Sequence, residues 1–228
     1  MAGTTVNENN IVYKTLQRAI NDKGFDVTLE QVLSEGAGKE KLQAIKSILA
    51  VYTQNRDEKI AHEIYQNFLV QLANAYDTFD ILPKENAEEL FEQLRRRNIR
   101  VVLNTGYNRE TAQSLIKKLR WTKRIEFDGL VTASDVHNNR PQPDMIQLAM
   151  TEFGIQDPAE VVKVGDSAID IEEGKNAGCG LSIGITTGAH TFEQLKAAQP
   201  DYIIDDLIEL LPLLDKQNSN FEHSSIQS

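Results

Sequence analysis

Two aspartates in the second half of the chain are spaced so that they could act together. Asp166 and Asp170 are four residues apart and follow the apolar run Val161–Val164 and Gly165. The run predicts a short buried strand, and the residues from Ala168 onward predict a helix. This spacing can place both carboxylates at the helix start, where they repel each other unless a cation lies between them. A hard ion such as Mg2+ would satisfy them, and the alternative is a helix cap beside a solvated acid.

A second polar group follows another predicted strand, Val101–Leu103. The strand leads into Thr105 and Gly106, and a helix is predicted to begin near Arg109. A threonine hydroxyl, a glycine amide and a helix amino terminus directed at one point form an anion site that suits phosphate. Thr105 could also serve only as a turn residue. The phosphate site is favoured because Gly165 lies at an equivalent strand end, and ligands bind at this edge of such sheets.

The third candidate is Arg140, which lies in the segment NNRPQPD before a predicted helix. Pro141 and Pro143 restrict this loop and hold the arginine on a stiff segment. A cation there could offset the charge of a phosphoryl group and its acceptor. An isolated arginine is more often a solvated surface group, so this interpretation depends on Thr105 and Asp166 lying nearby.

The elements that must position these residues fall into two parts with different patterns. Residues 8–80 predict helices only, with core-forming apolar stripes that begin at Ile11, Leu42 and Ile60, the second reaching Tyr52. From Asn86 onward, predicted helices alternate with strands, which indicates a doubly wound parallel sheet with right-handed crossovers. The predicted strands are Ile99–Asn104, Phe127–Thr132, Val161–Val164, Gly180–Ile185 and Tyr202–Ile204. The predicted helices are Ala87–Asn98, Arg109–Leu119, Pro143–Phe153, Ala168 to a stop at Gly178, Thr191–Ala198 and Asp206–Leu214.

The composition restricts the class of protein. A net charge of −10 over 228 residues argues against a nucleic-acid partner, because phosphates require a basic surface. No apolar run reaches the ~18 residues of a membrane span, and no signal-peptide pattern is visible. The single cysteine, Cys179, excludes an internal disulfide and suits a reducing cytoplasm. We therefore expect a cytoplasmic protein without nucleic-acid or membrane partners.

Taken together, TG after a strand, RPxP before a helix and GDSxxDxxxGxxAG after a strand resemble the haloacid dehalogenase superfamily. The segments AGTTV and NTGYNRE, the arginine of RPxP and the helical insert resemble its phosphonatase branch. The resemblance covers essentially the whole chain. It implies an α/β HAD-like, Rossmann-type core from residues 1–6 and 81–215, a mobile α-helical cap of residues 7–80, and a flexible tail of residues 216–228.

The resemblance also implies roles for individual residues. Thr105 would hydrogen-bond the transferring phosphoryl group beside the amide of Gly106, and Arg140 would steady the charge on that group and its acceptor. Lys39, in the segment GAGK, sits where the phosphonatase carries a Schiff-base lysine in its cap. A solvated lysine at a helix start is the alternative for Lys39.

The metal site and the nucleophile raise a further expectation. The resemblance implies Mg2+ held by Asp166, by Asp170 and by the backbone carbonyl of Ala2. The family's nucleophile is an aspartate directly before the residue equivalent to Met1, on a central strand, so we expect the chain as written to be impaired. We also expect two interior strands to have unpaired edges. Either the protein starts upstream, or the chain is an inactive relative.

The predicted function is therefore a Mg2+-dependent hydrolase of a small phosphonate or phosphate substrate. Superfamily phosphatases usually carry a general acid/base at the position of Ala2, so alanine there disfavours an ordinary phosphomonoesterase. The alternatives are a phosphatase of a small phosphate ester and a catalytically inactive, truncated relative. A homodimer through the cap is what the resemblance implies.

Overall fold

The computed structural model describes residues 1–216. In this part of the chain the strands are β1 (Val6–Asn7), β2 (Leu82–Pro83), β3 (Val102–Thr105), β4 (Gly129–Thr132), β5 (Val162–Gly165), β6 (Leu181–Ile185) and β7 (Tyr202–Ile204). The α-helices are α1 (Ile11–Asn21), α2 (Leu29–Gly36), α3 (Lys41–Ile48), α4 (Glu58–Thr78), α5 (Ala87–Arg96), α6 (Arg109–Leu119), α7 (Asp144–Phe153), α8 (Ala168–Ala177) and α9 (Phe192–Ala197). The predicted alternation of helices and strands after Asn86 is confirmed.

Three differences from the predicted elements stand out. The helix α2 was not predicted, because its eight residues carry too few apolar positions to mark a stripe. The last predicted helix, Asp206–Leu214, opens as a 3-10 turn at Leu207–Glu209 before residues 210–216 continue as a helix. The predicted flexible tail begins at residue 216, which belongs to that helix, and residues 217–228 lie outside the described part of the chain.

The sheet is parallel as predicted, but it is divided. β3 pairs only with β4, and β5, β6 and β7 form a second parallel sheet in that order. No ladder joins β3 to β5 within residues 1–216, so each has one unpaired side. This matches the expectation that two interior strands have unpaired edges. β1 and β2 form a separate antiparallel pair where the chain enters and leaves the helical insert.

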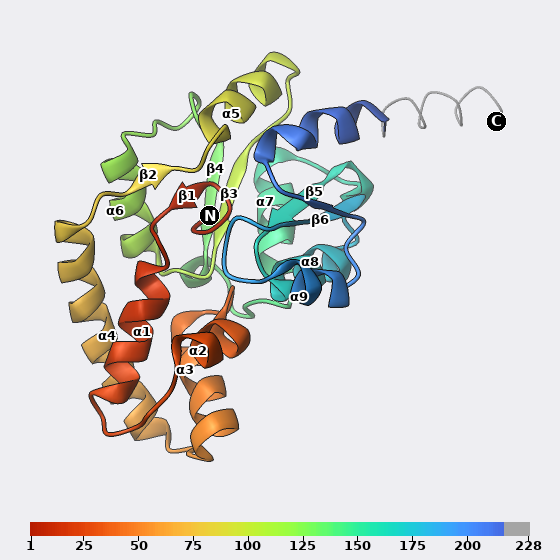
Figure 1. The fold of residues 1–228 in the computed structure, drawn as a ribbon. Coiled ribbons are helices and arrows are strands. Elements are labelled where there is room, and N and C mark those ends of the chain that lie inside the picture. Colours follow the sequence, from red (N-terminus) through yellow and green to blue (C-terminus); the bar gives the residue numbers. More distant parts are fainter. Residues whose placement is uncertain (217–228) are drawn as a thin grey trace.

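The helices α1 to α4 gather in a bundle beside the sheets (Figure 1). Their apolar stripes meet inside this bundle, where Leu16, Ile45 and Phe68 are fully buried. Tyr52 was predicted to continue the second stripe, but its side chain is 38% exposed. The reason is the π-helical turn at Leu49–Thr53, which contains Tyr52 and rotates its residues off the α-helical stripe.

The core helices carry their own start and stop signals. α6 begins after Asn108, whose side chain accepts a hydrogen bond from the Thr111 amide at 2.8 Å. α8 ends at Gly178, which was predicted as its stop and adopts the left-handed conformation. Among residues 1–216, no helix has the length and apolar character needed to cross a membrane.

Candidate functional site

The predicted anion-binding residues lie at the carboxyl end of β3. Thr105 is buried, and its hydroxyl oxygen accepts a hydrogen bond from the Tyr107 amide at 3.2 Å. The hydroxyl therefore closes a turn, and it retains a proton that it can donate to a ligand. Arg109 faces away from this point, because its guanidinium pairs with Asp135. Thr105, Gly106 and the start of α6 thus form the candidate phosphate loop.

Arg140 is the buried cation beside this loop. It is only 4% exposed, so the alternative of a solvated surface arginine is wrong. Its Nη1 atom lies 3.0 Å from Asp170 Oδ1, and its Nε donates to Glu173 Oε2 at 2.8 Å. Nη2 donates to the side-chain oxygen of Asn104, and Nη1 donates to the carbonyl of Gly38 at 3.2 Å. Arg140 therefore links the carboxyl end of β3 and the first turn of α8 to Gly38 of the cap.

A second buried cation, Lys163, was missed by the sequence reasoning. Its Nζ lies 3.0 Å from Asp170 Oδ1 and 2.6 Å from Glu173 Oε2. Burial raises the pKa of Asp170, but Arg140 and Lys163 outweigh burial and hold that pKa well below its usual range. The same two cations hold the pKa of Glu173 below its usual range against the effect of burial. Two features of the sequence could have indicated these residues. Lys163 is the one charged residue in the apolar run of β5, and Glu173 follows Asp170 by three positions in the same helix.

Asp166 occupies a different environment from Asp170. Its Oδ1 accepts a hydrogen bond from the Thr4 hydroxyl at 2.9 Å, and its Oδ2 accepts one from the Ala189 amide at 2.8 Å. A Cβ atom on Gly188 would lie 2.1 Å from Asp166 Oδ2, so the chain can approach this carboxylate only through a glycine. Both aspartates are buried near the start of α8, but they have different partners. Neutral hydrogen-bond donors surround Asp166, whereas two cations contact Asp170.

In the present arrangement, protein groups already compensate both oxygens of Asp170, so a divalent cation could bind there only by displacing them. Asp170 Oδ1 already has two cationic partners, Arg140 and Lys163, and its Oδ2 accepts a hydrogen bond from Ser167 at 2.5 Å. Within the described residues, no group of three or more histidine, cysteine, aspartate or glutamate side chains is placed to hold a metal. Ala2 is half-buried and bridges to Val6 in the first turn of the chain.

The amino group of Met1 lies at the unpaired side of β3. It donates to the carbonyl of Asn104 at 3.4 Å, close to the group around Arg140. Burial lowers the pKa of this amine to about 6, although Asp166 and Asp170 oppose the shift. The site thus brings together the first residue, the end of β3 and the start of α8.

The cap covers the phosphate loop through the segment that contains Gly38 and Lys39. A Cβ atom on Gly106 would lie 2.8 Å from the Lys39 carbonyl oxygen and 2.9 Å from that of Gly38. Gly106 therefore has no room for a side chain, and the segment of the helical insert at Gly38 and Lys39 covers the loop. The amide of Gly38 also donates to the Tyr13 hydroxyl at 3.1 Å, which ties the covering segment to α1.

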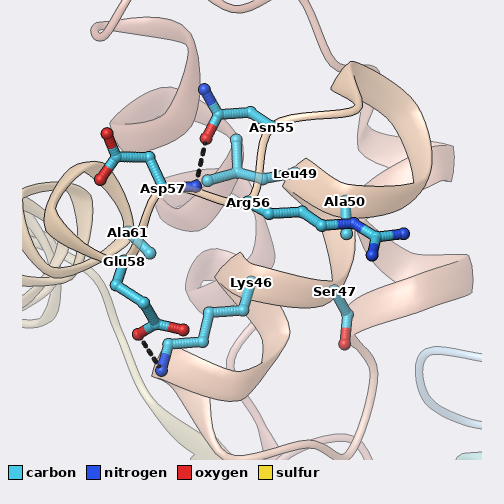
Figure 2. Close-up of a pocket in the computed structure, with 9 residues that line it drawn as sticks. All are labelled: Lys46, Ser47, Leu49, Ala50, Asn55, Arg56, Asp57, Glu58 and Ala61. Carbon is cyan, nitrogen blue, oxygen red and sulfur yellow. Dashed lines mark hydrogen bonds and ion pairs between the residues drawn. The ribbon is translucent and has the colours of Figure 1, made fainter.

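Lys39 is not brought into contact with Thr105 or Arg140. Its Nζ pairs with Glu35 Oε1 at 2.5 Å and donates to Ser47 Oγ at 3.2 Å. Ser47 also lines a cavity of about 360 Å³ in the helical insert (Figure 2). None of the predicted site residues lines this cavity. Lys46, Asn55, Arg56, Asp57 and Glu58 supply its polar lining.

The fold and the site define a class. The structure has an α/β core with parallel sheets, a polar site at the carboxyl ends of β3 and β5, and a helical insert that covers this site. Residues 1–183 match the model of haloacid dehalogenase-like hydrolases, and the chain belongs to this family.

The similar proteins carry related names. A phosphonoacetaldehyde hydrolase of Parabacteroides distasonis is 29% identical, and the match spans 87% of this chain and 86% of that protein. A phosphonoacetaldehyde hydrolase of Bacillus cereus strain ATCC 14579 is 26% identical, and the match spans 100% of this chain and 89% of that protein. The crystal structure of a phosphonoacetaldehyde hydrolase like protein from Oleispira antarctica superposes with a TM-score of 0.82 at 22% identity, covering 96% and 90% of the two chains. The crystal structure of a hydrolase from Pseudomonas syringae superposes with a TM-score of 0.82 at 19% identity, covering 94% of this chain and 95% of that chain.

Proposed function

We propose that this protein is a phosphonatase-like hydrolase that acts on a small phosphonate or phosphate substrate. The observation that carries the proposal is the closed contact between the cap and the phosphate loop, where Gly106 touches the carbonyls of Gly38 and Lys39 beside the buried Arg140. A small anion bound there would be enclosed by the cap. The names of the similar proteins favour phosphonoacetaldehyde as the first substrate to test.

In this proposal Thr105 and Arg140 act from the positions that they already hold. The Thr105 hydroxyl donates to a phosphoryl oxygen, and the backbone at Gly106 and the start of α6 add their dipoles. Arg140 supplies positive charge next to the anion, and Asp170 and Glu173 hold its guanidinium in place. Closure of the cap removes water, which strengthens these interactions.

The cap would also supply an amine. Lys39 is the candidate by its position in the chain, and an imine between a lysine and an aldehyde withdraws electrons from the neighbouring bond. To reach the phosphate loop, the Lys39 ammonium would first have to leave Glu35 and Ser47.

The family likeness implies Mg2+ as the cofactor, with Asp166, Asp170 and the carbonyl of Ala2 as its ligands. The metal would supply positive charge to the phosphoryl group. Because Arg140 and Lys163 already occupy Asp170, they would have to release Asp170 before it could bind a metal. The test therefore compares the protein after metal removal with the same protein after Mg2+ has been added back.

The test is release of inorganic phosphate from phosphonoacetaldehyde and from a panel of small phosphate esters. The assay is run after EDTA treatment, with and without added Mg2+. We expect release to be impaired overall, with phosphonoacetaldehyde as the best substrate, dependence on Mg2+ and complete loss in Thr105→Val. Thr151→Val, on the outer side of α7, is the matched control.

Two other outcomes would replace the proposal. Faster release from an ester would identify a phosphatase of small phosphate esters. No release from any substrate would favour a catalytically inactive relative. A cytoplasmic location and a homodimer through the cap stay predictions, and light scattering after gel filtration tests the second.

A further inference from the structure

A buried acid at the entrance of the helical insert, Glu8, has no part in the roles assigned above. It is only 3% exposed, and an acid is rarely buried unless specific partners compensate it. Its Oε2 accepts a hydrogen bond from the Val12 amide at 3.0 Å and another from the Tyr76 hydroxyl at 3.0 Å. The first bond satisfies an amide in the first turn of α1. The second leads to the other end of the insert, because Tyr76 lies in the last turn of α4.

The hydrogen bonds continue from Tyr76 into the core. The hydroxyl oxygens of Tyr76 and Tyr107 lie 2.9 Å apart, and both residues are buried. Burial raises the pKa of both tyrosines well above its ordinary value, so both hydroxyls keep their protons. A phenol has one proton to donate, and Tyr76 donates its proton to Glu8. Tyr107 therefore donates to Tyr76, and the hydrogen bonds run in one direction, from the core to Glu8.

Tyr107 is also the residue that contacts the Thr105 hydroxyl. Its backbone amide donates to Thr105 Oγ1 at 3.2 Å, and its carbonyl accepts from the Ala133 amide at 3.0 Å. The buried ammonium of Lys41, in the cap, lies 5.3 Å from the Tyr107 ring centroid and attracts the face of that ring. The Tyr107 ring is thus held at its hydroxyl and at its face, which restricts the backbone that orients Thr105.

We infer that Glu8 is a positioning residue that acts through Tyr76 and Tyr107 to orient the Thr105 hydroxyl toward a bound phosphoryl group. This inference rests on the proposed function. Glu8 precedes α1 and Tyr76 ends α4, so movement of these two segments relative to the core would break the bond to Tyr107. The Thr105 hydroxyl would then lose its fixed direction. A phosphoryl group is therefore bound tightly only while the cap is docked on the core.

The test observes the Tyr107 amide directly and does not require hydrolysis. Deuterium exchange of this amide, followed by NMR in the full chain, reports whether it still donates to Thr105. We expect Glu8→Met and Tyr76→Phe each to speed the exchange by about two- to tenfold, which corresponds to the loss of one hydrogen bond. Calorimetry should show inorganic phosphate binding more weakly to these variants by a similar factor. Glu8→Gln, whose amide oxygen can accept both hydrogen bonds, should restore both values.

Tyr202→Phe, which removes an exposed hydroxyl on β7, is the matched control. Glu8→Met combined with Tyr76→Phe should lose no more than either single variant, because both changes break the same series of hydrogen bonds.

Unchanged exchange in Tyr76→Phe would show that Glu8 serves α1 alone and would overturn the inference. Additive losses in the double variant, or equal losses in Tyr202→Phe, would overturn it as well. Tyr76→Phe keeps the test valid if Glu8→Met fails to fold. Phosphate binding that is the same in all variants would overturn this inference and leave the hydrolase proposal standing. No phosphate binding by the unmodified chain, with exchange changing as expected, would do the reverse.

Discussion

Arg140 Nη1 lies 3.0 Å from Asp170 Oδ1, and both side chains are almost fully buried. The arginine comes from the loop before α7 and the aspartate from the first turn of α8, so this ion pair joins two parts of the core. With Lys163 and Glu173 it makes a group of two cations and two carboxylates that share partners. A buried group of this kind is compensated only while every member is present.

We expect Arg140→Met to lower the free energy of unfolding by about 3–5 kcal/mol, because the two buried carboxylates would then share one cationic side chain, Lys163, in place of two. Urea denaturation measures the change. Arg96→Met is the matched control, since Arg96 pairs with Glu92 on the exposed side of α5 and should cost only about 0.3–0.5 kcal/mol. Equal losses in the two variants would show that the buried group contributes no special stability.

Glu8 makes stability depend on pH. Burial raises its pKa to about 7, although hydrogen bonds from the Val12 amide and the Tyr76 hydroxyl oppose the shift. The folded state therefore binds a proton that the unfolded state releases near its ordinary pKa of 4.5. The stability contributed by protonated Glu8 is complete below pH 4.5 and is lost as the pH rises through about 7.

Glu8→Gln removes this titration and leaves an oxygen that can accept the same hydrogen bonds. The stability of the variant relative to the unmodified chain should increase between about pH 4.5 and 8, by at most about 3 kcal/mol. Denaturation curves at several pH values measure the difference. The exposed Glu160→Gln should show no such trend, and a constant difference for Glu8→Gln would contradict the assignment.

Gly106→Ala should open the cap. The added methyl group would meet two backbone carbonyls of the cap below 3.0 Å, and overpacking of this kind costs about 1–3 kcal/mol. The open population should then rise by about fivefold or more. Trypsin cleavage after Lys41, which is buried in the closed form, reports this change. Gly184→Ala meets side chains only at 3.4 Å, so its cleavage rate should stay unchanged.

The divided sheet predicts a pattern of amide hydrogen exchange. Ile183 and Gly184 of β6 have strand neighbours on both sides, so consecutive amides there should be protected. β3 and β5 have one strand neighbour each, so only alternate amides should be protected. Exchange followed by NMR measures this. Continuous protection along β3 would mean that its second side is paired in solution.

The local sequence was sufficient for the order of helices and strands after Asn86, because periodicity and stop signals such as Gly178 act within a few residues. It also placed Thr105 and Asp166 at strand ends, since carboxyl ends of parallel strands meet at one edge. The π-helical turn around Tyr52 could not be predicted, because an inserted residue leaves the composition of the stripe unchanged.

The partners of these residues were decided by the tertiary structure. Arg140 and Gly38 are 102 positions apart, and Arg140 and Glu173 are 33 apart, so no local pattern reports their contacts. The same holds for the two lysines of the cap. Lys39 and Lys41 are two positions apart in one segment, but only Lys41 is buried, where it packs against Tyr13 and Tyr107. The amino-acid sequence supplies the chemical groups, and the packing of the cap on the core sets which of them are buried, because contacts between distant segments are not encoded in any local pattern.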